Sequence, residues 1–273
     1  MSNATSKFND IGFLSNESAS NLISQQVISS ESYKICFDLN IFAQSVLNHA
    51  LVHPDDRKEV YAIVYFQRML SDYQAILLLA ERGMTHQSEI ILSAMLETLF
   101  DLVAFHRHDD FFEALILGDA AQRLAFFKTI REQQQTRQSF TSDELQELDR
   151  LIASAEDIDR SDFKVYMKAD LAGMLHEYRT TYALLSETVH SAVHSLEADL
   201  EMNHHHEVEA INAYEQKIGT MFTLLMTTAN YMTIGLNMIL KIVPNAENEA
   251  GLKKLRDRMQ VEWQSTSVAV PHR

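Results

Sequence analysis

Glycine and proline are scarce in this sequence, with only 7 and 3 residues among 273. These two residue types supply most of the turns that sheets and α/β units need at short intervals. Their scarcity disfavours an all-β or α/β fold and favours long helices joined by few loops. Because 46% of the residues are hydrophobic, the chain can bury a sizeable core.

Cysteine is almost absent, since Cys36 is the only one. A single cysteine excludes a disulfide within the chain, which is typical of proteins in a reducing compartment. The first twenty residues contain no basic segment followed by an apolar run, so they do not resemble a signal peptide. We therefore expect a cytoplasmic protein.

Positive charge is also in short supply, with 23 Lys and Arg against 38 Asp and Glu, a net charge of -15. A broad nucleic-acid surface needs clustered cations, so this class of function is disfavoured. The uncharged run over residues 218–240 is long enough to cross a bilayer. Its apolar residues recur every three or four positions, which indicates a helix that faces a protein core. We expect no membrane partner.

The spacing of apolar residues and of helix caps predicts an all-α fold, a single helical-bundle domain with long antiparallel helices and an N-terminal helical arm. The expected parts are a flexible N-terminus over 1–17, an N-terminal helix over 18–52, the bundle core over 53–243, and a C-terminal helix and tail over 244–273. Within the core, one long helix is expected over about 162–201 and the next over about 207–242.

The predicted long helix carries polar side chains beside its apolar stripe, in the segment LHEYRTTYALLSETVHSAVHSLEADL. On an ideal helix, four of them fall within about 40° of one another: Arg179, Ser186, His190 and Glu197. Polar groups at the edge of a buried stripe are half desolvated yet reachable, as reactive and ligand-binding groups often are. The alternative is that Arg179 and His190 only bind neighbouring helices and fix their packing.

An earlier apolar helix carries Glu97 and, one turn later, Asp101. Two carboxylates among Leu and Phe side chains repel each other and resist burial, so they need a cation nearby. We predict that Glu97 contacts Arg179 or His190 and that these three residues form a polar pocket. They are also the candidate catalytic residues if the pocket is an active site.

Two segments, LLLAERGMTHQSEIILSAMLETLFDL and YRTTYALLSETVH, resemble a bacterial family of helical proteins of unknown function, over about residues 60–240. Members often carry Arg three residues before the glutamate of the first segment. This chain has Ala94 there, which makes Arg179 the expected partner of Glu97. The family is in turn similar to the HEPN superfamily. That similarity implies a homodimer and, as an alternative function, a metal-independent ribonuclease of a toxin–antitoxin or anti-phage system.

The chain departs from the HEPN catalytic pattern, in which His follows Arg after four to six residues. Ten residues separate Arg179 from His190, which places them roughly 16 Å apart along a helix. RNA cleavage would therefore need a different site or a contribution from a second subunit.

A metal site is a second alternative, based on Glu187, His190 and His194 in ETVHSAVH. Two histidines four residues apart can bind one metal ion from one helix face, and Glu-x-x-His pairs hold iron in some helical bundles. The sequence has no second pair of this kind, so the site would hold one zinc or iron ion with a carboxylate from an earlier helix.

The function that the sequence favours is a non-catalytic interaction or ligand-sensing module, without a cofactor. Its partner would be another protein or a small ligand, because an acidic protein is poorly suited to attract a polyanion. RNA is a partner only for the ribonuclease alternative.

Overall fold

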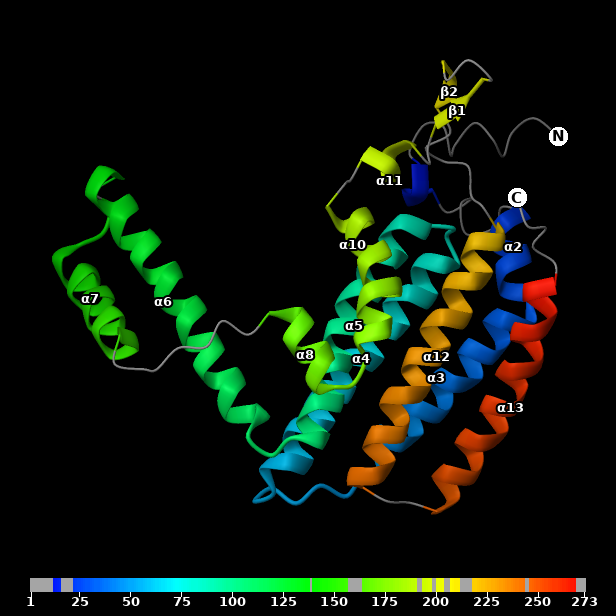
Figure 1. Cartoon of the computed structure of the whole chain (residues 1–273), viewed down its shortest axis with the longest axis horizontal. Helices are drawn as coiled ribbons and strands as arrows, with labels where there is room; N and C mark the ends of the chain where they lie inside the picture. The colour runs from blue at the N-terminus through cyan, green and yellow to red at the C-terminus, as the bar shows by residue number, and fades with distance from the viewer. Residues whose placement is uncertain are drawn as a thin grey trace.

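The computed structural model describes residues 12–15, 22–137, 139–156, 164–190, 193–197, 200–203, 207–211, 218–243 and 246–268. Five long helices form one bundle (Figure 1): α3 (Glu31–His49), α4 (Arg57–Ala80), α5 (Thr85–Arg107), α12 (Ile218–Ile242) and α13 (Ala246–Val268). The short α2 (Leu22–Ser29) precedes them, and η1 (Gly12–Leu14) is a single 3-10 turn. The predicted all-α, single-domain fold is confirmed.

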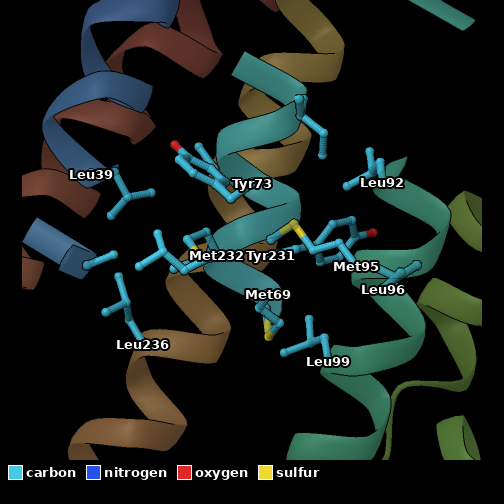
Figure 2. Packing of buried hydrophobic residues seen from close by; sticks show 14 of the residues in the cluster. Leu39, Met69, Tyr73, Leu92, Met95, Leu96, Leu99, Tyr231, Met232 and Leu236 are labelled. Atoms are coloured by element: carbon cyan, nitrogen blue, oxygen red, sulfur yellow. The ribbon is translucent and has the colours of Figure 1, made fainter. Parts of the chain in front are cut away.

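Helix α12 is the centre of the bundle, because it contacts α3, α4, α5 and α13. Figure 2 shows side chains from α3, α4, α5 and α12 meeting in one apolar core, among them Leu39, Met69, Leu96 and Leu236. The apolar stripe predicted for residues 218–240 therefore faces protein. No helix in the described part of the chain is long and apolar enough to cross a membrane.

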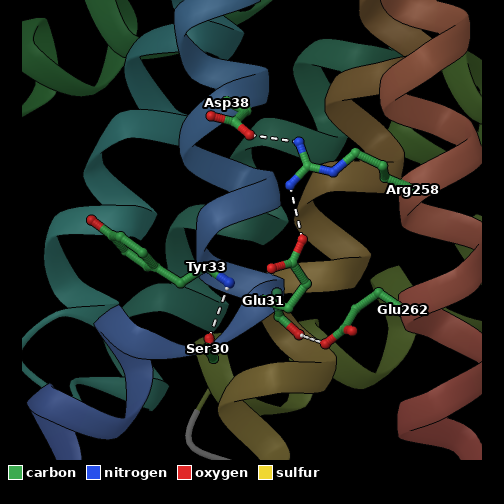
Figure 3. A network of polar contacts seen from close by, with 7 residues as sticks. Ser30, Glu31, Tyr33, Asp38, Arg258 and Glu262 are labelled. Carbon is green, nitrogen blue, oxygen red and sulfur yellow. Dashed lines mark hydrogen bonds and ion pairs between the residues drawn. The ribbon is translucent and has the colours of Figure 1, made fainter.

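The N-terminal helix is a member of the bundle, whereas the sequence suggested an arm. Cys36 and Leu39 of α3 are fully buried, and the helix contacts α12 and α13. Polar contacts add to this packing (Figure 3): Arg258 of α13 reaches Asp38 at 2.6 Å and Glu31 at 2.8 Å. The hydroxyl of Ser32 donates to Glu262 at 2.7 Å. Most of the expected flexible N-terminus, residues 1–17, lies outside the described residues.

The predicted helix over 162–201 is wrong as a single element. In its place stand α8 (Val165–Leu171), α9 (Leu175–Glu177), the π-helix η3 (Tyr178–Tyr182), α10 (Ala183–Val189), α11 (Val193–Glu197) and β1 (Leu200–Met202). Gly173 follows α8 with a φ of +63, a left-handed conformation that ends a helix. Only part of the predicted apolar stripe faces the core: Tyr178, Tyr182 and Leu185 pack there, whereas Val189 and Leu196 are exposed.

The next predicted helix starts later than expected. Residues Val208–Ile211 form strand β2, which pairs with β1 as an antiparallel two-stranded hairpin, and helix α12 spans Ile218–Ile242. The hairpin is a small addition to a helical fold.

Helices α6 (Phe111–Arg137) and α7 (Ser142–Glu156) form a helical hairpin that stands apart from the bundle (Figure 1). The backbone N–H of Glu144 donates to Thr141 Oγ1 at 3.3 Å, and the Glu144 carboxylate accepts from the Thr141 N–H at 2.7 Å. This reciprocal pair is the capping box that the sequence TSDE predicts.

Candidate functional site

A row of polar contacts joins α5 to the segment from α8 to α10. Five polar side chains, four of α5 and one of the residue that caps it, meet groups of that segment: Glu89 with Thr188, Glu97 with Tyr182, Asp101 with Lys168, Arg107 with the Ala172 carbonyl, and His108 with the Leu171 carbonyl. We call this row the α5 seam. Because its contacts lie on α8 and its C-terminal end, on η3 and on α10, the seam fixes the path of a segment that is not one continuous helix.

Glu97 lies near the middle of the α5 seam and is half-buried. Its Oε1 accepts a hydrogen bond of 2.7 Å from the hydroxyl of Tyr182. The Tyr182 ring stacks on Tyr178 with centroids 5.3 Å apart and meets Phe100 edge-on. Burial, and then the adjacent Glu97 carboxylate, raise the pKa of the Tyr182 phenol above its ordinary value, so Tyr182 is a permanent donor to Glu97.

The predicted contact of Glu97 with Arg179 or His190 is not formed. In the described part of the chain Glu97 has no ion pair with either residue, and both side chains are exposed. Arg179 lies within η3, and His190 is the residue at which α10 ends. The prediction assumed uniform helical spacing, which η3 and the end of α10 interrupt. A catalytic role for Glu97, Arg179 and His190 stays a prediction, as does RNA cleavage.

The cation that Asp101 needs is Lys168 of α8. The ammonium group of Lys168 lies 3.0 Å from the Asp101 carboxylate, and both side chains are largely buried. Burial raises the pKa of Asp101, while Lys168 acts in the opposite direction and Glu97 adds a smaller upward effect. The expectation of a paired carboxylate was correct, and the identity of its partner was not.

The metal alternative involves residues that the structure describes only in part. Glu187 and His190 are exposed at the end of α10, and the side chain of His194 lies outside the described set. Within the part of the chain that is described, no group of three His, Cys, Asp or Glu side chains is arranged to hold a metal ion. A site at Glu187, His190 and His194 stays a prediction.

An open groove of about 720 Å³ lies between η3, α12 and α13. Hydroxyl and amide groups make up much of its wall, and the hydroxyl of Tyr231 donates to Thr181 Oγ1 at 2.8 Å across one side of it. Each of the three elements contributes polar or aromatic side chains to the lining: Thr180 and Thr181 from η3, Thr227 and Asn230 from α12, and Arg256 and Trp263 from α13.

The groove is not the pocket that the sequence predicted. Among the described residues that line it, Glu97, Arg179 and His190 do not appear, whereas His176 and Glu177 of α9 do. The sequence did contain one signal for it, the neutral polar face of residues 218–240. That face includes Thr227 and Asn230, which now line the groove. Its other walls come from segments far away in the chain, which no local pattern connects.

Together, the fold and the groove define a single-domain helical-bundle protein with an open polar groove beside a π-helix. Residues 59–209 match the model of a family of unknown function, DUF5677, and the chain belongs to this family. The matched region contains the whole α5 seam, whereas the α12 and α13 walls of the groove lie beyond it. No curated protein matches the chain, and no solved structure does.

Proposed function

We propose that the protein is a non-catalytic ligand-binding module whose groove takes an uncharged heteroaromatic molecule of the nucleoside or nucleobase class. The groove volume of about 720 Å³ falls within the range of roughly 300–1,000 Å³ that is typical of small-molecule sites. It is therefore large enough for a nucleoside.

The lining of the groove is the observation that carries the proposal. Its walls hold several threonine hydroxyls and the amides of Asn230 and Gln260, groups that donate and accept hydrogen bonds without carrying charge. These groups suit a ligand with several donors and acceptors on its edges. They are weak acids and bases, so they fit binding better than proton transfer.

Trp263 supplies a surface for a planar ring at the same groove, because indole stacks well on heteroaromatic rings. The described lining also contains one acidic and one permanently cationic side chain, Glu177 and Arg256. Since these opposite charges offset each other, an uncharged ligand fits the groove better than an ion does.

The π-helix η3 adds support, because π-helices are rare and occur often at functional sites. Here the five residues of η3 serve two sides at once. Tyr182 binds Glu97 in the α5 seam, while Thr181 binds Tyr231 at the groove. The seam therefore holds one wall of the groove in place.

Equilibrium dialysis of the full chain against adenosine, and separately against uridine, tests this function. We expect saturable binding of one nucleoside per chain. Asn230→Leu should weaken it about tenfold, the loss of a hydrogen bond or two at roughly 1 kcal/mol each. Asn237→Leu is the matched control, because Asn237 lies two turns further along α12 and outside the described lining. No binding of either nucleoside at millimolar concentration would refute the proposal.

A further inference from the structure

Glu177 is an acidic side chain of the groove to which no described protein group donates. It is the last residue of α9, is half-buried and lines the groove. In the described part of the chain its carboxylate forms no hydrogen bond and no ion pair. Burial raises the pKa of the Tyr231 phenol, and the nearby Glu177 carboxylate adds to this effect. Glu177 is therefore a charged acceptor inside the groove that still needs a donor.

Two hydroxyl groups close to Glu177 have already given their protons to other acceptors. Thr180 Oγ1 donates to the His176 carbonyl at 2.7 Å. The hydroxyl of Tyr231 donates to Thr181 Oγ1 at 2.8 Å. Because an ionised carboxylate only accepts hydrogen bonds, the donor that Glu177 needs comes from water or from a ligand in the groove.

The register of α12 against α13 shows what lies beside Trp263. Thr233 Oγ1 contacts Met259 Sδ at 3.5 Å, and the two helices run in opposite directions (Figure 1). Trp263 is one turn after Met259, and Asn230 is about one turn before Thr233, so Trp263 is level with Asn230. Both line the groove. A planar base stacked on Trp263 would therefore have the Asn230 amide beside its edge.

The register of η3 against α12 places Glu177 toward the other end of the groove. Thr181 is bonded to Tyr231, and the segment from η3 to α10 runs in the same direction as α13 (Figure 1). Glu177, one turn before Thr181, thus lies toward the end at which Arg256 lines the groove. Arg256 is two turns before Trp263, roughly 10 Å along α13. The groove therefore has an aromatic end and a charged end.

The charged end indicates which donor fits. Arg256 is exposed and, like Glu177, has no ion pair in the described part of the chain. A ligand ammonium group would be repelled by Arg256, whereas neutral hydroxyls would not. Two adjacent hydroxyls can both donate to one carboxylate, and acidic side chains bind ribose in this way elsewhere.

We propose, on the basis of the nucleoside site inferred above, that Glu177 accepts hydrogen bonds from the 2′- and 3′-hydroxyls of ribose. The groove then selects ribonucleosides over 2′-deoxyribonucleosides and free bases. The base lies at the Trp263 end and the sugar at the Glu177 end.

Dissociation constants for matched nucleosides test this assignment without any variant. Equilibrium dialysis of the full chain compares adenosine with 2′-deoxyadenosine and 2′-fluoro-2′-deoxyadenosine, and uridine with the same two analogues of uridine. The fluoro group is polar but cannot donate. Each ribonucleoside that binds should do so at least about tenfold more tightly than either analogue, the effect of one hydrogen bond to a charged group. Equal or tighter binding of the analogues would overturn the sugar assignment and leave the nucleoside site standing. No binding of either ribonucleoside would refute both.

Glu177→Gln assigns the preference to this carboxylate. The affinity for adenosine should fall about tenfold, because a neutral amide is a weaker acceptor. The affinity for adenine, which lacks the sugar, should stay within about twofold. Glu249→Gln is the matched control, since Glu249 loses the same charge on α13 but is exposed and outside the described lining. It should change neither affinity. An unchanged preference for ribose in Glu177→Gln, or an equal loss for adenosine and adenine, would contradict the proposal.

Discussion

The hydroxyl of Tyr182 donates a 2.7 Å hydrogen bond to Glu97, and this contact ties the π-helix to α5. It satisfies a half-buried carboxylate with a neutral donor, where sequence reasoning expected a cation. The same turn places Thr181 against Tyr231 at the groove. The turn that carries this contact therefore links the α5 seam to the groove.

Tyr182→Phe should lower the free energy of unfolding by about 1–3 kcal/mol, because it leaves the Glu97 carboxylate without its donor. Urea denaturation followed by circular dichroism measures the change. Tyr178→Phe is the control, since Tyr178 stacks on Tyr182 but its hydroxyl has no hydrogen bond in the described part of the chain. That variant should cost less than about 0.5 kcal/mol. Equal effects of the two would show that the ring contacts matter and the hydrogen bond does not.

Lys168→Met should destabilise the protein by about 2–3 kcal/mol at neutral pH, because it leaves Asp101 buried without a cation. The effect should shrink as the pH is lowered. Burial raises the pKa of Asp101 in the folded state, so the folded protein takes up this proton more readily than the unfolded chain does. Protonated Asp101 no longer needs a cation.

Urea titrations at pH 7 and near pH 4.5 measure this dependence. Lys253→Met is the control, since Lys253 forms an exposed pair with Asp257, and such pairs contribute about 0–1 kcal/mol. A Lys168→Met effect that grows toward acid pH would contradict the assignment.

Gly173→Ala should destabilise the protein by at least about 1–2 kcal/mol, because alanine strains at a φ of +63. A Cβ there would also overlap the guanidinium of Arg107, which donates to the neighbouring Ala172 carbonyl. Gly219→Ala in the first turn of α12 is the control, since a Cβ at Gly219 meets open space. It should be neutral or slightly stabilising. Thermal unfolding of both variants makes the comparison, and similar melting temperatures would contradict the account of this turn.

The thiol of Cys36 should not react with a disulfide reagent such as DTNB at pH 8 while the protein is folded. Burial raises the pKa of Cys36 to about 12, and only the thiolate is a good nucleophile. In urea above the unfolding transition, one thiol per chain should react within minutes. Rapid and complete labelling of the native protein would show that α3 is not packed in the bundle as described.

The sequence was sufficient for the fold class and for local features whose causes are local. Scarce glycine and proline predicted the helices, and the segment TSDE has the residue pattern of the capping box that Thr141 and Glu144 form. The straight helix over 162–201 was wrong because Gly173 ends α8 and because η3 departs from regular α-helical spacing. A periodic apolar stripe reports neither feature.

The groove could not be predicted from the sequence. Thr180, Asn230 and Trp263 come from three segments that are distant in the chain, and each carries an ordinary polar or aromatic residue on a helix. Only their meeting in space makes them a candidate site. Glu97 and Asp101 could be recognised as carboxylates in need of partners, but the identities of the partners, Tyr182 and Lys168, depend on tertiary packing alone.

The central claim is that the groove between η3, α12 and α13 binds a nucleoside-like ligand, and the fluorescence of Trp263 tests it most directly. Trp263 is the only tryptophan of the chain and lines the groove, so emission excited at 295 nm reports on that place alone. The account predicts a saturable change in this emission with adenosine or uridine, at the same dissociation constant as in dialysis. Binding in dialysis with unchanged Trp263 emission, or no binding at all, would contradict it.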